Sequence, residues 1–209
     1  MGGILTLSIQ GICLAIDTST SRTSVAIVDQ SALLWHGFQY GATSHGEALP
    51  SLVAKALAVQ PELEKVVVGM GPGPFTGLRV GIAFARTFAL ARSIPIFGVC
   101  SLDAIATSVS EENDFIVATD ARRKEVYWAK YISGKRVDGP HVDYPKTISE
   151  FGLPIFGEGA VKYGISNSDE NLFPDLVSLV TLSENVDLRV ETPMYLRRPD
   201  AVPTSERSS

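Results

Sequence analysis

The segment whose residue types could do chemistry most directly is a glycine- and proline-rich loop at residues 71–77 (GPGPFTG), with Arg79 just beyond it. Glycine permits positive φ and close backbone approach, while proline stiffens the turn. The loop joins a β-branched run to an Ala-rich segment. We therefore expect a strand-to-helix turn, with Thr76 as the helix N-cap and free N–H groups that can bind an anion. It is not a P-loop, because no Gly-Lys-Ser/Thr follows.

Arg79 falls in the first turn of the expected helix, where the helix dipole disfavours a cation. Its position indicates an acidic partner or a bound anion. An ordinary β–α turn with an exposed arginine accounts for the same residues and stays an alternative.

A second candidate site follows the apolar run at residues 12–16, where Asp17, Thr18 and Ser19 stand at an expected strand end. A carboxylate and hydroxyls in such a place can hold Mg²⁺ and a phosphate. The same residues commonly form a plain Asx or Ser/Thr turn. If a nucleotide or another anion binds, the predicted contacts are Asp17, Thr18, Gly71 and Gly73.

The histidines and cysteines give weaker signals. His36, His45 and His141 are isolated in sequence, and His45 precedes a helix, so a capping or surface role is expected rather than metal binding. Cys13 and Cys100 lie in apolar stretches, which predicts buried thiols rather than a disulfide or a metal site. A GxSxG nucleophile elbow does not occur in the sequence.

Composition indicates a folded protein without an overall affinity for RNA. The chain has 209 residues, of which 45% are hydrophobic and 20% charged, and its net charge is -5. It can bury one large core or two small lobes. No basic excess or Lys/Arg stripe is visible in the sequence, so the chain is not expected to grip RNA by itself. The charged segment 120–125 (DARRKE) is interpreted as a hairpin turn, most simply a solvated one.

The first 11 residues lack the basic start of a signal peptide, and no apolar run approaches the roughly 18 residues of a membrane helix. These features predict a cytoplasmic protein.

The expected elements divide the chain into two α/β units. The predicted units are residues 10–108 and the smaller 109–200, with a flexible tail at 201–209. The expected strands are 12–16, 24–28, 33–40, 65–69, 95–100, 115–119, 126–132 and 155–156, and the expected helices are 46–59, 77–91 and 102–109. Residues 134–154 show no strong periodicity.

Five segments, in the same order along the chain, resemble the TsaB (YeaZ-like) family. The loop GPGPFTGLR followed by an Ala-rich helix, and then a DAR-x-x-E-VY segment, is a specific combination. The segments are residues 14–29, 44–53, 69–106, 120–131 and 193–202.

The resemblance implies an α/β fold of the two-lobed actin/Hsp70/sugar-kinase ATPase-like type (ASKHA, ribonuclease H-like) with a reduced second lobe. It also implies an accessory subunit, not an enzyme by itself, in the complex that transfers a threonylcarbamoyl group to the adenosine next to the tRNA anticodon. The implied partners are a TsaD-type catalytic subunit and a TsaE-type ATPase. Contact with tRNA would be made only through the complex.

Two departures support the accessory role. TsaD-type relatives carry an Asn-His-x-x-x-His metal motif after the next strand, and here Ser101 and Ile105 stand in the places of two ligands. A hydroxyl and a branched alkane cannot replace two imidazoles. The turn after Asp17 also lacks the glycine of active superfamily ATPases. We therefore expect no tightly bound cofactor, with ATP or ADP and Mg²⁺ acting at the level of the complex.

The predicted partner surface comprises the helix at 46–59 and the helix after the loop. A homodimer and a monomer are both compatible with the sequence. Two other functions stay open, a free-standing Mg-ATP-dependent kinase or ATPase using Asp17 and Asp120, and a glycoprotease-like peptidase. The residues assigned to the partner surface are His45, Leu49, Leu52, Val53, Arg79 and Arg86.

Overall fold

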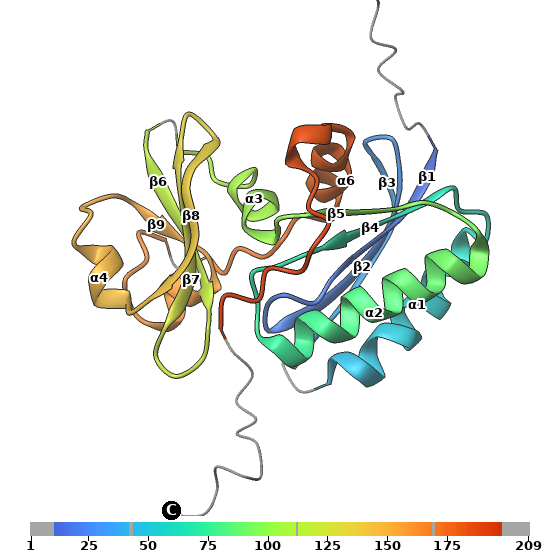
Figure 1. Cartoon of the computed structure of the whole chain (residues 1–209), viewed down its shortest axis with the longest axis horizontal. Coiled ribbons are helices and arrows are strands. Elements are labelled where there is room, and N and C mark those ends of the chain that lie inside the picture. The colour runs from blue at the N-terminus through green and yellow to red at the C-terminus, as the bar shows by residue number, and fades with distance from the viewer. Residues whose placement is uncertain (1–10, 42–43, 112, 169, 198–209) are drawn as a thin grey trace, which may run out of the picture.

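The computed structural model describes residues 11–41, 44–111, 113–168 and 170–197, and it places two β-sheets side by side (Figure 1). The start of the chain, for which we predicted no signal peptide, lies outside these residues except for Gly11. The predicted flexible tail at 201–209 also lies outside them. No helix in the described ranges is long and apolar enough to cross a membrane.

The first sheet has five strands in the order β3-β2-β1-β4-β5. The first three strands form an antiparallel meander, as predicted, and β4 and β5 continue the sheet in parallel with β1. Their bounds are β1 Ile12–Asp17, β2 Arg22–Asp29, β3 Ala32–Tyr40, β4 Lys65–Gly69 and β5 Ile96–Val99.

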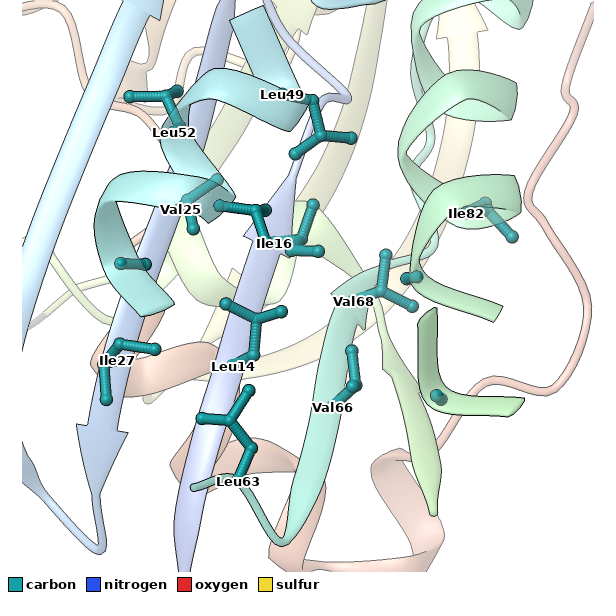
Figure 2. Packing of buried hydrophobic residues seen from close by; sticks show 14 of the residues in the cluster. Leu14, Ile16, Val25, Ile27, Leu49, Leu52, Leu63, Val66, Val68 and Ile82 are labelled. Atoms are coloured by element: carbon teal, nitrogen blue, oxygen red, sulfur yellow. The ribbon is translucent and has the colours of Figure 1, made fainter. Parts of the chain in front are cut away.

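Both faces of the first sheet are covered, which explains why its central strands are apolar throughout. Helices α1 (His45–Val59) and α2 (Phe75–Arg92) cover one face, and α6 (Leu176–Glu184) covers the other (Figure 1). Alternate residues of β1 point to opposite faces. Leu14 and Ile16 pack under α1 and α2, whereas Cys13 and Ala15 pack under α6. Figure 2 shows the α1 and α2 side of this core.

The second sheet has four strands in the order β8-β7-β6-β9. Strands β6, β7 and β8 are antiparallel, and the short β9 runs parallel to β6. Helix α3 connects the two sheets, and the 3₁₀ helix η1 follows α6. The bounds are β6 Phe115–Asp120, β7 Val126–Ile132, β8 Lys135–Asp143, β9 Ile155–Phe156, α3 Ser101–Ala106, α4 Pro145–Ser149, α5 Glu158–Lys162 and η1 Val186–Leu188.

Several predicted elements need correction. Residues 134–154, expected to be irregular, form β8 and α4. Gly139 and Pro140 lie inside β8 and obscure its alternation. Thr76 is not the N-cap, because α2 begins at Phe75 with Pro74 at the cap and no side-chain cap hydrogen bond. The helix predicted at 102–109 is shorter, ending at Ala106.

Helix α6 was not predicted from the sequence, although it covers one face of the first sheet. It follows the second sheet in sequence but packs on β1, β2, β4 and β5 of the first. Its Glu184 carboxylate lies 3.4 Å from the Lys65 ammonium of β4. The division at residues 108 and 109 stays a prediction, and the chain crosses between the sheets a second time before α6.

Candidate functional site

The carboxyl ends of β1 and β4 lie at the same edge of the first sheet, since the two strands are parallel neighbours. This edge brings together Asp17 and Thr18 with Gly71 and Gly73, the four residues predicted to contact a nucleotide. Open α/β sheets commonly bind ligands at such an edge. Whether a ligand can bind at this edge depends on the hydrogen bonds and close contacts of these four residues.

Asp17 is bound by the chain itself. Its Oδ1 accepts hydrogen bonds from the amide of Ser19 (2.8 Å) and from its hydroxyl (2.7 Å), and its Oδ2 accepts one from the Ser101 hydroxyl (2.6 Å). The residue is only 1% exposed. Burial raises the pKa of Asp17, and the hydrogen bonds from Ser101 and Ser19 partly oppose that rise. The chain's own donors thus use both oxygens of this buried carboxylate, which leaves it little capacity to hold a Mg²⁺–phosphate.

Ser101 takes a structural role at the position where the resemblance places a metal ligand. Its hydroxyl donates to Asp17 and accepts from the backbone amide of Gly71 at 3.3 Å. The Ser101 amide also donates to the Gly71 carbonyl at 2.8 Å. The side chain therefore joins the ends of β1 and β4 to the start of α3. We call Asp17, Ser19, Gly71 and Ser101 the strand-end lock.

The glycines near the lock are required by the chain's own packing. A Cβ at Gly69 would lie 1.8 Å from Asp17 Oδ2, and a Cβ at Gly73 would lie 2.5 Å from the Ser19 carbonyl oxygen. The Thr18 hydroxyl donates to the Gly77 carbonyl at 2.8 Å, close against α2. The loop thus fixes the start of α2 against the turn after β1.

Arg79 and Arg86 lie on the exposed side of α2. The Arg79 guanidinium lies 5.9 Å from the centre of the Phe75 ring, and that ring packs on Tyr195 with centroids 4.9 Å apart. Arg86 Nη2 donates to the Glu191 carbonyl at 3.0 Å. The proposed contact of Arg79 with an acidic partner or an anion stays a prediction.

The rest of the predicted partner surface must be corrected. Leu49, Leu52 and Val53 are 0%, 6% and 3% exposed and belong to the core beneath α1 (Figure 2). The apolar stripe that predicted the helix faces the sheet, so these side chains offer little surface to a partner. His45 is 4% exposed, and its Nδ1 lies 2.7 Å from the Thr23 hydroxyl, so the expected surface role was wrong. Burial lowers the pKa of His45, and the charge of Arg122 lowers it further.

The cysteine prediction is confirmed. Cys13 and Cys100 are free and buried, and burial raises the pKa of each thiol to about 12. His141 pairs with Asp138 at 2.7 Å on the surface. Among the residues that the structure describes, no group of three or more His, Cys, Asp or Glu side chains could hold a metal ion.

A second charged centre lies where β6 ends, and the sequence showed only part of it. The Asp120 carboxylate accepts hydrogen bonds from Lys162 Nζ (2.5 Å), the Tyr163 hydroxyl (2.9 Å) and the Arg122 amide (3.0 Å). Burial opposes ionisation of Asp120, but these hydrogen bonds outweigh it, and its pKa lies below the usual value. Lys162 and Tyr163 are 42 and 43 residues away in sequence, so no local pattern could have linked them to Asp120.

The turn between β6 and β7 has an unusual backbone. Arg122, Arg123 and Lys124 have φ values of 63°, 51° and 62°. The left-handed helical region costs non-glycine residues about 1–2 kcal/mol each. The hairpin closes through the Ala121 amide to the Glu125 carbonyl (3.0 Å) and the Glu125 amide to the Arg122 carbonyl (2.9 Å). Arg197 supports it from outside, with Nη1 on the Ala121 carbonyl (2.7 Å) and Nη2 at 2.8 Å from the Glu125 carboxylate.

Glu158 links the second sheet's side of the molecule to the turn after β1. Its carboxylate accepts hydrogen bonds from the Ser21 amide (3.1 Å) and from the Ser21 hydroxyl. Burial raises the pKa of Glu158, and the hydrogen bonds from Ser21 partly oppose that rise. The Thr119 hydroxyl is buried and has no hydrogen-bond partner among the described residues.

Comparison with known proteins adds to this geometry. A family model described as TsaD, tRNA N6-adenosine threonylcarbamoyltransferase, matches residues 39–173. An uncharacterized Mycobacterium tuberculosis (H37Rv) protein is 40% identical over 203 residues, which cover 91% of this chain and 93% of the relative. Escherichia coli K12 tRNA threonylcarbamoyladenosine biosynthesis protein TsaB is 34% identical over 125 residues, 56% of this chain and 54% of that protein. The match with this TsaB therefore spans about half the length of either protein.

Solved structures agree with the sequence comparison. A Pseudomonas aeruginosa protein described as similar to peptidase YeaZ superposes with a TM-score of 0.71 and 26% identity, covering 89% of this chain and 99% of that one. YeaZ from the same organism has a TM-score of 0.67 at 24% identity. The predicted α/β fold of the actin/Hsp70/sugar-kinase ATPase-like type is confirmed by these neighbours and by the two-sheet topology.

Proposed function

Because this chain is a TsaB/YeaZ-like member of the family described as TsaD, we propose that it acts in tRNA threonylcarbamoyladenosine biosynthesis as a non-catalytic subunit. The observation that carries the proposal is the strand-end lock. At the sheet edge where a relative with catalytic activity would bind its ligand, Asp17 and Ser101 bind each other.

The packing around the lock supports a scaffold role. Ser101 and Ile105 are 1% and 0% exposed, so neither side chain is directed to a solvent-filled site. The Gly73 backbone packs on Ser19 where a phosphate would need room. These contacts hold α2 at a fixed position on the sheet. A rigid α2 is useful to a protein that presents this helix to a partner.

The proposed partner is a TsaD-type catalytic subunit, which the chain would bind and activate through α1 and α2. Their outer faces are solvent-exposed and partly apolar. Leu90 of α2 is 81% exposed, and Arg79 and Arg86 lie on the same helix. In the absence of the partner, the same face would pair two copies of this chain. A TsaE-type ATPase would join the complex, and ATP or ADP with Mg²⁺ would act there.

Reconstitution tests this function. The chain would be mixed with TsaD-type and TsaE-type proteins from the same organism, unmodified tRNA, ATP and the threonylcarbamoyl donor. Mass spectrometry of digested tRNA then measures threonylcarbamoyladenosine. We expect product formation to depend on this chain and the chain to co-elute with the TsaD-type protein in gel filtration. Full product formation in its absence would contradict the proposal.

The alternatives predict different measurements. A free-standing kinase or ATPase would bind Mg-ATP with low-micromolar affinity and lose it on Asp17→Ala, which the occupied carboxylate of Asp17 opposes. A peptidase would cleave a protein substrate and depend on one nucleophile. Calorimetric titration with Mg-ATP and a casein cleavage assay examine these two functions on the same preparation.

A further inference from the structure

The β6–β7 turn gathers cations that are scattered in the sequence. We call the following group the basic strip: Arg122, Arg123, Lys124, Lys162 and Arg197. Contacts with the turn connect three of its members. Lys162 and Arg122 both lie against Asp120, with Nζ–Oδ2 and Nε–Oδ2 distances of 2.5 and 3.9 Å, and Arg197 binds the turn at Ala121. In Figure 1 the turn is the lower end of the second sheet.

The carboxylates near the basic strip are turned inward and occupied. Asp120 and Glu158 are 8% and 7% exposed, and they accept hydrogen bonds from Lys162 and Ser21 respectively. Glu125 pairs with Arg197, and the two side chains are only 20% and 24% exposed. The other four cations, by contrast, reach solvent. The side chains of Arg122 and Lys162 are 47% and 48% exposed, and Arg123 and Lys124 are exposed as well. A chain of net charge -5 thus presents a locally cationic surface.

The backbone of this surface is held by several contacts. Three consecutive positive φ values set the directions of the Cα–Cβ bonds of three basic residues, and the hairpin bonds and Arg197 hold that conformation. A ligand that binds here meets cations whose backbone needs no reordering, which lowers the entropic cost of binding.

Aromatic rings continue the surface toward α2. Tyr195 is 40% exposed, two residues before Arg197, and its ring packs at a tilt on Phe75 at the start of α2, with centroids 4.9 Å apart. Figure 1 shows this C-terminal segment running from the first sheet to the space between the turn and the start of α2. Cations beside an exposed ring match RNA, whose phosphates pair with cations and whose unpaired bases stack on aromatic side chains.

We propose that the basic strip and Tyr195 bind RNA, with the strip on the phosphate backbone and the tyrosine ring against an unpaired base. This inference rests on the proposed function in tRNA modification and deepens it. It assigns to this chain an RNA contact of its own, beyond any contact made by the catalytic subunit. An acidic protein would use the cations but has less use for the exposed ring, so RNA fits the whole surface better.

The test uses the full chain and a fluorescein-labelled, unmodified tRNA transcript, with fluorescence anisotropy measured between about 50 and about 200 mM salt. We expect Lys124→Glu to weaken binding about threefold to tenfold and Arg123→Glu/Lys124→Glu to weaken it further. The slope of log K against log salt should fall by roughly 1–2, because each lost phosphate contact removes about one unit. Tyr195→Ala should weaken binding with little change in that slope.

The matched control is Lys135→Glu, an exposed lysine beside the opposite hairpin of the same sheet. It makes the same charge change and should leave binding near that of the wild type. Glutamate carries a Cβ as arginine and lysine do, so it leaves the backbone cost of the turn unchanged. Should a glutamate variant unfold, Arg123→Asn/Lys124→Asn removes the charges with a residue that tolerates this conformation.

Three results would overturn the proposal: no wild-type binding at the lowest salt, an equal loss in Lys135→Glu, or competition by polyglutamate as strong as that by unlabelled tRNA. The last result would assign the surface to an acidic protein. The reconstituted modification assay is separate. If the strip binds RNA but modification does not need this chain, the proposed function fails and the RNA surface stands. If modification needs the chain but charge reversal leaves RNA binding unchanged, the RNA surface fails and the proposed function stands.

Discussion

The two sheets place an aspartate at equivalent positions and use it in opposite ways. Asp17 is the last residue of β1, and Asp120 is the last residue of β6. Each strand pairs with an antiparallel neighbour on one side and a parallel one on the other. Hydroxyls and an amide surround Asp17, and burial raises its pKa. An ammonium and a phenol bind Asp120, whose pKa is lowered. The partners of the carboxylate, rather than its place in the strand, determine its role.

The turn after β1 is structural, whereas the turn after β6 carries a charged surface. The strand-end lock closes the edge of the first sheet and positions α2, whereas Asp120 organises a turn whose cations face solvent. If this division is right, changes in the lock should mainly affect stability. Changes around Asp120 should affect stability less and depend on pH in the opposite direction.

The largest effect is expected for Asp17→Ala. It removes the acceptor of three hydrogen bonds and leaves the Ser19 and Ser101 donors buried without a partner. We expect the free energy of unfolding to fall by about 3 kcal/mol, measured by urea denaturation. Asp29→Ala, at the half-buried end of β2, is the control and should cost far less. A loss below about 0.5 kcal/mol would show that the lock does not hold the sheet edge.

The next largest effect is expected for Gly73→Ala. A Cβ there would lie 2.5 Å from the Ser19 carbonyl oxygen and 2.8 Å from its Cα, and backbone atoms cannot rotate away. We expect a loss of about 2 kcal/mol in unfolding free energy. Gly46→Ala in α1 is the matched control, since nothing lies within 4 Å of its added Cβ. Equal stability of the two variants would mean that the loop has room for a ligand after all.

A smaller effect with an informative pH dependence is expected for Asp120→Asn. At pH 7 the loss should be about 1 kcal/mol, because Lys162 is half exposed and solvent screens its pairing with Asp120. The folded pKa of Asp120 is lowered, so its stabilising effect is present above the usual value near 3.8 and disappears as the pH falls through the folded pKa.

Asp17 gives the matching measurement with the opposite sign. Its folded pKa is raised, so any gain from protonation is complete below about pH 3.8 and is lost as the pH rises through the folded value. Stability curves of the wild type, Asp17→Asn and Asp120→Asn between pH 3 and 7 would show the two trends. If the stability of the two variants changed with pH in the same way, the two aspartates would not differ in their electrostatic role.

The first sheet could be predicted from sequence because its signals are local. The meander, the buried strand β4 and the helix α1 follow from alternation, β-branched runs and helical spacing. The buried side of α1 was visible in the same pattern, but its stripe was assigned to a partner although Leu49 and Leu52 face the sheet. An apolar stripe does not reveal whether the sheet or a partner covers it.

The contacts that could not be predicted from the sequence join residues that lie far apart along the chain. Ser101 reaches Asp17 across 84 positions, and Glu158 reaches Ser21 across 137. The basic strip combines three cations of the charged segment 120–125, which were visible in the sequence, with Lys162 and Arg197, which only the fold brings near. A count of net charge could not detect a surface on which the carboxylates turn inward.

The smallest effect is expected for Arg79→Glu. This substitution tests whether α2 and the β6–β7 turn bind separate partners. Arg79 is exposed on α2, so reversal should not alter the core. If α2 presents this residue to an acidic group of the TsaD-type subunit, affinity should fall about threefold to tenfold, mainly through slower association at low salt. Lys124→Glu makes a comparable charge change on the other surface and should leave this affinity unchanged. Surface plasmon resonance with the immobilised TsaD-type protein measures both. Equal losses would mean that one continuous cationic face serves a single partner, and the division between a docking helix and an RNA-binding turn would then be wrong.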